Sequence, residues 1–565
     1  MKWAPASIAR WLFDPRRGPS DRLLARWLFL WALGLIYFSA FFSLVFQVRG
    51  LIGPQGILPA SEYLREVAQS LGPARSWFAP SLLWFSSGAH MLTGLCWAGM
   101  AASLLLVLNL WPRGALLACF LCFLSFVSAA GDFSAYQSDG MLLEAGFLAL
   151  FFAPPGLRPG LAGRHPPMRA SMFLLQWEWF RIYFESGVAK LASGDPEWRH
   201  LTAMDEYYQN GPLPTWIGWY VQHLPHWFHA GAALATLVLE LALVWMMFLP
   251  RRWRIACFLI ATGWQIPVIL TANYTFLNYL VLSLGILLVD DRLLTRVVPW
   301  PWRKHLQERI AGPSSSVARP QAEPLSVWRA VLQETPTQPS REQTPAARVE
   351  RNWRERTRPK LAALRFALAG AMLSWIFYAT TAQLVWMLLP ALPLPTKPVA
   401  ALAPLRVANQ FGLFAVMTRG RYEIEFQGSD DGQTWLAYPF RFKPQDPYKP
   451  PGIYAPYQPR LDWNLWFASL GGWRASPIVA RTEMQLLSPN ADVLSLFAGN
   501  PFPHGPPHQV RALLWQYWFS SMAEKRTQGL WWKRELLGLY APVLEREPDG
   551  KVAILEWPEP LPPHD

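Results

Sequence analysis

Charged residues are scarce in this chain of 565 residues: Lys, Arg, Asp and Glu make up only 16% of it. Soluble domains of ordinary composition carry about 25% of such residues. Hydrophobic residues make up 52% and aromatic residues 15%, and the mean hydropathy is +0.12. This composition excludes a mainly disordered chain and argues against a purely soluble enzyme. It is typical of a protein that crosses a membrane several times.

Cysteine is also rare, and all of it lies in the first half of the chain. The four cysteines, Cys96, Cys119, Cys122 and Cys257, fall in apolar stretches. Cys119 and Cys122 have the CxxC spacing of redox motifs, but they lack the basic neighbours that activate a thiol. We therefore expect them to be small packing residues. Thiol–disulfide exchange in the C-terminal part of the chain is excluded.

Signatures of soluble catalysis are missing as well. The chain contains no GxSxG nucleophile elbow, no HExxH zinc motif, no P-loop and no GxGxxG that follows a strand. The sequence therefore indicates neither a metal site nor a bound cofactor.

Long apolar runs are what the sequence has instead. A bilayer core of about 30 Å needs about 20 apolar residues in a helix. Five runs meet this length clearly, two are short, and two are weak because they carry ionisable residues. The clear runs are Trp27–Val45, Met91–Leu110, Ala115–Ala130, Trp227–Leu249 and Ala362–Leu389, the short ones are Ile255–Leu270 and Phe276–Val289, and the weak ones are Met141–Ala153 and Met168–Leu191. The pattern predicts a multi-pass α-helical membrane protein with about 7–9 spans.

The net charge of +13 lies mainly on two segments, residues 1–26 (+4) and 292–360 (+8). If residues 1–26 are cytoplasmic and every segment crosses, the inner loops hold 27 basic residues and the outer loops hold 4. The positive-inside rule then places residues 390–565 outside the cytoplasm. Basic residues that flank apolar blocks are typical of a membrane protein, and we expect no nucleic-acid partner.

These patterns divide the chain into five predicted parts. A basic cytoplasmic N-terminus (1–26) precedes a polytopic membrane domain (27–291). A disordered, basic, proline-rich cytoplasmic linker (292–360) then leads to a last transmembrane helix (361–389). The remainder, residues 390–565, is expected to form an extracytoplasmic domain.

The C-terminal domain is predicted to be β-rich. Tyr422, Ile424 and Phe426 alternate with polar residues, as in a half-buried strand, and the turn residues 429–432 follow. Further strands are expected at Thr434–Phe442, Val510–Phe519 and Leu530–Leu544, and helices at Asp462–Leu470 and Pro477–Phe497. We infer a β-sandwich-like domain with helical insertions.

Ionisable residues at membrane depth form the most informative cluster, because such groups are costly and usually paired. Its members are Asp139, Glu144, Arg181, Glu185, Lys190 and Glu240. The spacing of Glu178, Arg181 and Glu185 predicts an intrahelical ladder of charges. Lys190 needs a partner elsewhere, either Glu144 or Glu240. Two interpretations stay open: pairs that hold the bundle together, or a buried site with Lys190 as a base.

Several long blocks resemble the lipase maturation factor family. They are residues 137–148 (QSDGMLLEAGFL), 186–199 (SGVAKLASGDPEWR), 272–278 (ANYTFLN), 409–414 (NQFGLF), 459–463 (PRLDW), 498–503 (AGNPFP) and 529–534 (GLWWKR). Members of that family are polytopic proteins of the endoplasmic reticulum membrane, needed for certain secreted lipases to become active. The resemblance therefore implies a maturation role there, or in the cytoplasmic membrane if the chain is bacterial.

A more distant resemblance concerns residues 184–198. This stretch is similar to a motif of the vitamin K-dependent γ-carboxylase superfamily, in which a lysine acts as the base in quinol oxygenation. The position that matches this lysine is Lys190.

Two hypotheses of function follow. In the first, the chain is a chaperone-like maturation factor without enzymatic activity, whose C-terminal domain binds a secreted, lipase-like client protein while the remainder lies in the lipid bilayer. Exposed aromatic residues would be the client anchors, and the candidates are Trp463, Trp466, Trp531 and Trp532. In the second, the chain is an intramembrane enzyme that acts on a quinone or a lipid, with Lys190 as base.

Overall fold

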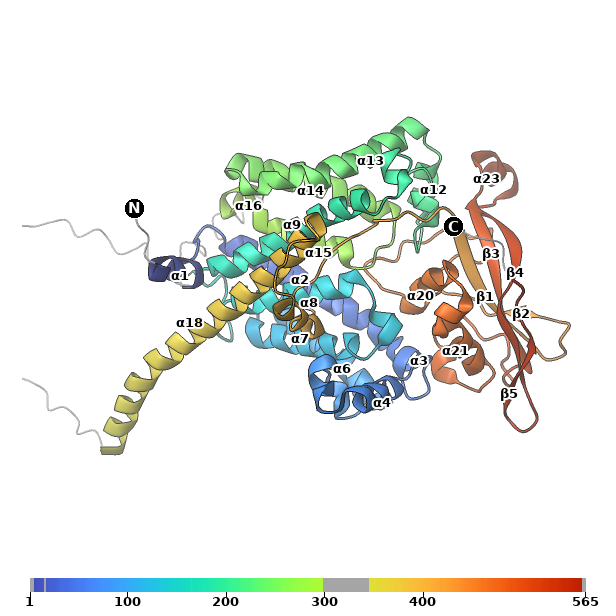
Figure 1. Cartoon of the computed structure of the whole chain (residues 1–565), viewed down its shortest axis with the longest axis horizontal. Helices are drawn as coiled ribbons and strands as arrows, with labels where there is room; N and C mark the ends of the chain where they lie inside the picture. Colours follow the sequence, from blue (N-terminus) through green and yellow to red (C-terminus); the bar gives the residue numbers. More distant parts are fainter. Residues whose placement is uncertain (1–4, 15–16, 164, 298–344, 561–565) are drawn as a thin grey trace, which may run out of the picture.

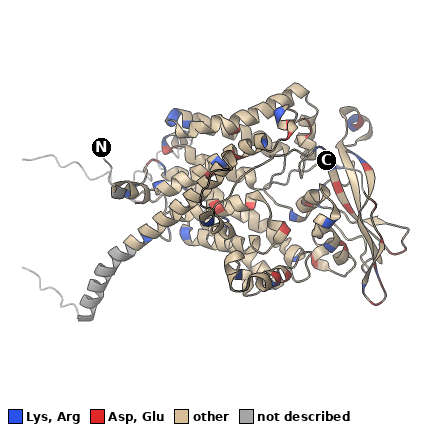
Figure 2. Ribbon diagram, viewed as in Figure 1, with Lys and Arg blue, Asp and Glu red and all other residues tan. Residues whose placement is uncertain are grey.

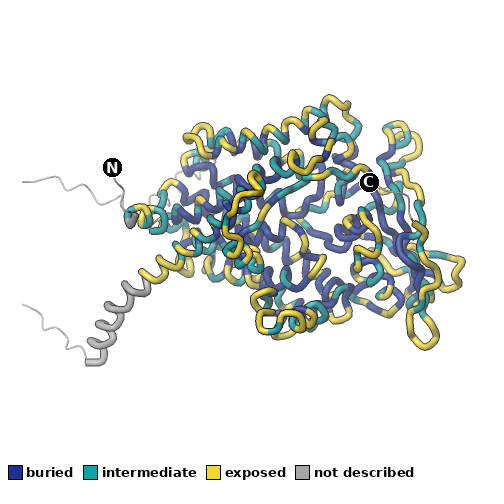
Figure 3. The backbone as a smooth tube through the Cα atoms, in the orientation of Figure 1, coloured by how far each residue is buried: buried dark blue, intermediate teal, exposed yellow. Residues whose placement is uncertain are grey.

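The computed structural model describes residues 5–14, 17–163, 165–297 and 345–560, and it has two parts. A helical bundle forms the larger part, and a C-terminal domain of one sheet and several short helices lies at one end of the bundle (Figure 1). Buried residues continue from the bundle into the helices and the sheet of the C-terminal domain, in a single hydrophobic cluster (Figure 3). The two parts therefore share one core.

In the described part of the bundle, nine helical segments follow one another. They are α2 (Leu23–Val45), α6 (Ala89–Val107), α7 (Pro112–Val127), α8 (Gln137–Phe152), α9 (Arg169–Ala192), α13 with η5 (His226–Leu241 and Leu243–Phe248), α14 (Arg251–Thr271), α15 with η6 (Leu277–Gly285 and Ile286–Leu288) and α18 (Pro345–Leu388). Shorter pieces, α3 (Val48–Ile52), α4 (Ala60–Leu71), α11 (Tyr207–Asn210) and α12 (Trp216–Gln222), connect them.

Five of these segments are long and apolar enough to cross a membrane: Leu23–Val45, Ala89–Val107, His226–Phe248, Arg251–Thr271 and Ala363–Leu388. The prediction of membrane-spanning helices is thus confirmed, although these five helices are not the same five as the runs predicted to be clear spans. Helix α14 is longer than the predicted run because it begins at Arg251, whereas α7, predicted as a clear span, has only 16 residues. The count of 7–9 spans stays a prediction.

Contacts between loops define the end of the bundle that lies away from the C-terminal domain. There the Arg22 guanidinium donates to the Leu287 carbonyl oxygen (3.2 Å), and Arg113 Nε donates to the Ala153 carbonyl oxygen (2.9 Å). Between this end and the C-terminal domain, most of the helical bundle is uncharged, with a few charged positions in its interior (Figure 2). The described loops with basic residues, around residues 17–26, 157–163, 165–169 and 251–254, and the C-terminal domain therefore lie at opposite ends (Figure 1).

Most of the segment predicted as a linker, 292–360, lies outside the described residues. Its two ends are helical: the first residues belong to α16 (Asp291–Val297), and the last ones begin α18, which continues without a break into the last apolar run.

The C-terminal domain contains one antiparallel sheet of five strands in the order β2-β1-β3-β4-β5. The strands are β1 (Arg421–Ser429), β2 (Leu436–Ala437), β3 (Gln509–Phe519), β4 (Trp532–Arg546) and β5 (Val552–Glu556), and the helices are α20 (Arg460–Ser469), α21 (Pro477–Leu486), α22 (Ala491–Leu494) and α23 (Met522–Gln528). The predicted strands at Val510–Phe519 and Leu530–Leu544 and the predicted helix Asp462–Leu470 are therefore present, with small shifts of their ends. The predicted helix Pro477–Phe497 is divided into α21 and the short α22.

The prediction of a β-sandwich is wrong, because there is no second sheet among the described residues. Ile424 and Phe426 face the core that the helices of the domain complete, as Figure 1 shows for α20 and α21 beside the sheet. The return strand shrinks to Leu436–Ala437. Pro439, inside the predicted strand, explains this, since proline has no N–H to extend the ladder.

Candidate functional site

The predicted polar cluster lies at the junction between the bundle and the C-terminal domain. Its centre is an irregular stretch that precedes β1, residues 406–418, which we call the docking segment. This segment runs along α9, with its backbone bonded to side chains of that helix. The Phe411 N–H donates to Glu185 Oε2 (2.7 Å), and the Leu413 N–H donates to Ser186 Oγ (3.2 Å).

Beyond α9, the docking segment is held by the short turn that follows the helix. The Met417 N–H donates to Asp195 Oδ2 (2.7 Å), and Trp198 Nε1 donates to the Phe414 carbonyl oxygen (2.9 Å). Backbone groups that would otherwise be buried without partners are thus satisfied by polar side chains of the bundle.

Arg181 forms the first ion-pair group of the junction, with Glu144 on α8 and with Glu185 (3.8 Å), and all three side chains are buried. Arg181 also donates to the carbonyl oxygen of Asn409, whose own N–H donates to Glu144 Oε2 (2.9 Å). The predicted pair of Arg181 and Glu185 is confirmed. The predicted contact with Glu178 is wrong, because the tertiary fold brings Glu144 to the guanidinium instead.

Lys190 forms the second ion pair, with Glu240 on α13 (2.9 Å). This was one of the two partners expected from the sequence. The same ammonium group donates to the Leu413 carbonyl oxygen (2.8 Å) and lies 5.1 Å from the centre of the Trp198 ring. A small cavity of about 80 Å³ lies beside it, lined among others by Tyr183, Lys190, Glu240 and Gln265.

Asp139 forms the third ion pair, not with the other members of the cluster but with Arg460 of the C-terminal domain. Both carboxylate oxygens accept from this guanidinium (2.8 and 3.0 Å), and both side chains are fully buried. Arg460 also donates to the Phe133 carbonyl oxygen and to Gln458 Oε1. The six predicted residues therefore divide into three groups, and each group holds the C-terminal domain on the bundle.

The prediction of exposed tryptophan anchors is wrong for three of the four residues. Trp463, Trp466 and Trp532 are buried, and Trp531 is half-buried. The Trp463 ring packs edge-on against Tyr136 at a distance of 5.4 Å between ring centres, within the junction. A sequence pattern of Trp and Leu does not distinguish a core from a binding surface, and here the rings fill the core.

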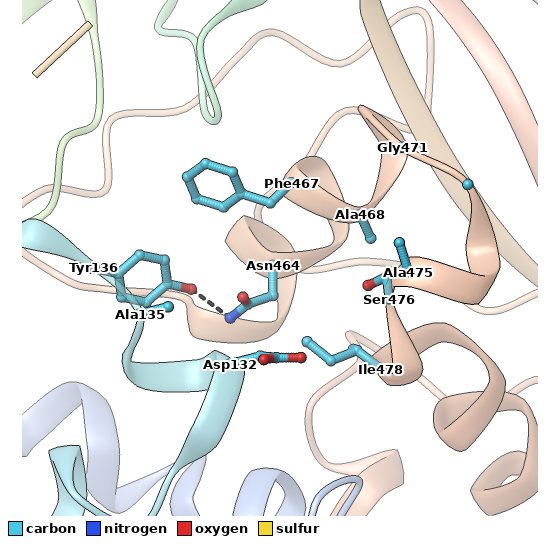
Figure 4. A pocket seen from close by; sticks show the side chains of 11 residues that line it. Asp132, Ala135, Tyr136, Asn464, Phe467, Ala468, Gly471, Ala475, Ser476 and Ile478 are labelled. Atoms are coloured by element: carbon cyan, nitrogen blue, oxygen red, sulfur yellow. Dashed lines mark hydrogen bonds between the residues drawn. The ribbon is translucent and has the colours of Figure 1, made fainter. Parts of the chain in front are cut away.

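A cleft of about 340 Å³ opens between the two parts, next to the buried junction. Figure 4 shows its walls: Asp132 and Tyr136 come from the bundle, and Asn464, Phe467 and Ser476 come from the C-terminal domain. Asn464 donates to the hydroxyl oxygen of Tyr136 across the cleft floor. Phe467 is 47% exposed, so this cleft presents an aromatic face to the outside.

Similarity to known proteins covers both parts of the chain. A family model described as lipase maturation factor transmembrane domain matches residues 24–296, and one described as lipase maturation factor C-terminal domain matches residues 407–542. Lipase maturation factor 2 from Homo sapiens is 32% identical over 92% of this chain and 82% of its own length. The chain belongs to the lipase maturation factor family. Lipase maturation factor 1 from Bos taurus is 30% identical, over 95% of this chain and 92% of its own.

No solved structure gave a significant match. The lipase maturation factor blocks quoted above nevertheless acquire a physical meaning from the geometry. Blocks 137–148, 186–199, 272–278, 409–414 and 459–463 each supply residues to the junction described here.

Some junction residues of this lipase maturation factor relative were not singled out in the sequence. Asn273 is buried between α14 and α15 and accepts from the backbone N–H groups of Tyr454 (2.6 Å) and Ala455 (3.0 Å). Arg460 and Asn409 are the other two. All three lie inside blocks that resemble the family, and this resemblance was the available signal.

Asp462 on α20 offers a test of the packing beside the junction. Burial raises the pKa of Asp462 to about 6, although the N–H groups of Lys443 (3.1 Å) and Phe442 (3.3 Å) bind its carboxylate. An unfolded aspartate has a pKa of about 3.9. The folded state therefore holds the proton more tightly, and this contribution to stability is present below about pH 4 and is lost as the pH rises to 6.

We therefore expect Asp462→Asn to gain stability relative to the native protein as the pH rises from 4 to 7. Two pKa units correspond to about 3 kcal/mol, and the asparagine oxygen still accepts both N–H groups. The measurement is the difference in unfolding free energy between the two purified proteins in detergent as a function of pH. A difference that does not change with pH would contradict a raised pKa.

Proposed function

We propose that this chain is a membrane-anchored maturation factor that assists exported proteins, secreted lipases in particular, to reach a folded and assembled state. The observation that carries the proposal is family membership over both parts of the chain. The lack of cysteine after Cys257 supports a non-covalent holding or assembly role rather than disulfide chemistry.

The location proposed for the C-terminal domain is the extracytoplasmic side of the membrane. The excess of basic residues in the predicted inner loops supports this orientation, and the described ones among these loops lie at the opposite end of the bundle. The membrane would be that of the endoplasmic reticulum in a eukaryotic cell, or the cytoplasmic membrane in a bacterium. In either case the domain meets exported proteins as they begin to fold.

A pair of reporter fusions tests this orientation. A fusion after Leu332 should report the cytoplasm, and a fusion at Asp565 should report the outer compartment, because the inner and outer loops hold 27 and 4 basic residues. The measurement is the activity of a reporter enzyme that works on one side of the membrane only. The control is a second reporter that works only on the other side. A fusion at Asp565 that reports the cytoplasm would overturn the orientation.

The client contact is proposed to lie at the cleft between the two parts. Phe467 offers an exposed aromatic face there, while three of the four tryptophans considered first are in the core. Exposed aromatic side chains give large contact area at low entropic cost. We expect Phe467→Ala to reduce the amount of client protein that co-purifies with the chain. Leu536→Ala, which changes a similarly exposed residue on β4, should leave this amount unchanged.

Loss of the gene tests the function itself. We expect at least one exported lipase to be synthesised but inactive, aggregated or degraded, and to recover when the native chain is supplied again. The measurement compares lipase activity with the amount of lipase antigen. Unchanged activities of all exported enzymes would contradict the proposal.

The second candidate function is an intramembrane enzyme acting on a quinone or a lipid, with Lys190 as base. The observation that favours it is the small cavity beside Lys190. Against it, the Lys190 side chain is already bound by the Glu240 carboxylate (2.9 Å) and the Leu413 carbonyl oxygen (2.8 Å), so a structural role accounts for its position. Accumulation of a quinone or lipid species after gene loss, with lipases unaffected, would favour the enzyme.

A further inference from the structure

Within the connection between α4 and α6, residues 72–85 expose several large apolar side chains. We call this segment the elbow. It consists of three short turns, η2 (Gly72–Ala74), α5 (Arg75–Phe78) and η3 (Leu82–Trp84). Trp77 is 55% exposed, Phe78 is 56% exposed and Phe85 is 85% exposed. Single exposed apolar residues are normal on a protein surface, but a group of them in one short segment marks a contact surface.

The elbow is held firmly, so its exposure follows from the fold. Ser81 Oγ donates to the Ser125 carbonyl oxygen (2.8 Å), and the Leu82 N–H donates to Ser125 Oγ (2.9 Å) at the end of α7. Leu83 is buried against the bundle. Trp84 Nε1 is bound by the Ala79 carbonyl oxygen (2.8 Å), which fixes the last turn.

The position of the elbow relates it to the lipid-facing surface of the bundle. It leads through Ser86, Ser87 and Gly88 into α6, a candidate membrane span that exposes Trp97 and Leu104. The elbow thus lies next along the chain to the start of that span. Figure 1 shows α4 beside α6 and α3, on the side of the C-terminal domain, and Figure 3 shows how exposed this region is.

A second group of aromatic residues lies at the same end of other spans. Trp216 and Tyr220 on α12 and Trp227 at the start of α13 are exposed, Trp227 by 74%. Tryptophan and tyrosine are enriched where a membrane meets water, because each has an apolar ring and a polar atom. The two groups would lie at one level if the bilayer surface passes there.

We propose that the elbow is immersed in the head-group region of the leaflet on the side of the C-terminal domain, and that its partner is the lipid itself. The elbow then has a mechanical role. Glu62 on α4, next to it, pairs with Arg481 on α21 (3.1 Å), and Gln485 of the same helix donates to the Gly56 carbonyl oxygen (3.3 Å). These contacts fix the height of the C-terminal domain above the bilayer.

Site-directed spin labels test this proposal in the full-length protein reconstituted in vesicles of phosphatidylcholine and phosphatidylglycerol. The four native cysteines are buried, so a label can be directed to Phe85→Cys or Phe78→Cys. Leu104→Cys on α6 is the control for lipid contact, and Tyr448→Cys, 63% exposed in a loop of the C-terminal domain, is the control for water. The readout is the ratio of collisions with oxygen to collisions with a water-soluble nickel chelate.

We expect labels at Phe85 and Phe78 to give a ratio severalfold above that of Tyr448→Cys, between the two controls. A ratio equal to that of Tyr448→Cys would overturn the proposal, since the elbow would lie in water. Protection from both reagents, together with a co-purified protein, would overturn it as well, because a protein would then cover the elbow. Both substitutions replace exposed side chains, and size-exclusion chromatography confirms that the labelled proteins are folded.

Discussion

Replacing Arg181 by leucine should reduce the amount of folded protein in the membrane severely. The substitution removes the charge that two buried carboxylates share, those of Glu144 and Glu185, and it removes the donor to the Asn409 carbonyl oxygen. Breaking a buried ion pair on one side costs about 3–5 kcal/mol, which is a large part of the stability of an ordinary domain. The measurements are the quantity of inserted protein and its thermal stability in detergent.

The comparison needs two further variants. Arg526→Leu removes an exposed arginine on α23 and should leave both quantities unchanged. Arg181→Lys keeps the charge but loses the planar fork that contacts several acceptors, and it should have an intermediate effect. Normal abundance and stability of Arg181→Leu would show that this side chain is not buried in the junction.

The second large effect is expected at Lys190, where one experiment separates a structural role from a catalytic one. Lys190→Met leaves Glu240 without its partner and removes the donor to the Leu413 carbonyl oxygen, and we expect a loss of about 3–5 kcal/mol. The double variant Lys190→Met with Glu240→Leu removes both charges and fills similar volumes. Proteins in which a buried ion pair is replaced by apolar residues in this way are often as stable as before or more stable. The double variant should therefore regain most of the stability that Lys190→Met loses.

The decisive measurement is function in the stable double variant. If lipase activity in cells lacking the native gene is restored by the double variant, Lys190 acts through its ion pair. If the double variant is stable and inserted but does not restore activity, the amine itself is needed, and the enzyme hypothesis takes precedence. Lys190→Met alone does not distinguish the two, because instability also abolishes activity.

Local contacts of the site could be predicted from sequence spacing, and long-range ones could not. Residues four apart face each other on a helix, which is why the pair of Arg181 and Glu185 was predictable. Nothing in the spacing indicated that Glu144, 37 positions away, would displace Glu178 from the guanidinium. Lys190 could be assigned to two possible partners, and only the packing of α13 against α9 decided for Glu240.

The fold of the C-terminal domain shows the same division. The sequence patterns indicated β1, β3 and β4 correctly, whereas β2 is much shorter than predicted and β5 was not predicted. Alternation does not indicate what covers the buried face of a strand, and the domain uses helices where a second sheet was predicted. The burial of the tryptophans of α20 was unpredictable for a related reason: Trp463 is covered by Tyr136, which comes from a distant part of the chain.

The position of the docking segment in the chain also determines when the protein can be completed during its synthesis. Arg181 is separated by 228 residues from Asn409, which closes its group of charges. At about 5–20 residues per second, a ribosome needs roughly 10–50 s to make that distance. During this interval α13, α14, α15 and α18 are also made, while the segment that binds Glu185 and Ser186 is still missing. A nascent chain interrupted after α18 would lack the Phe411 and Leu413 N–H groups that bind these two side chains, so the junction is completed only after the whole bundle has been made.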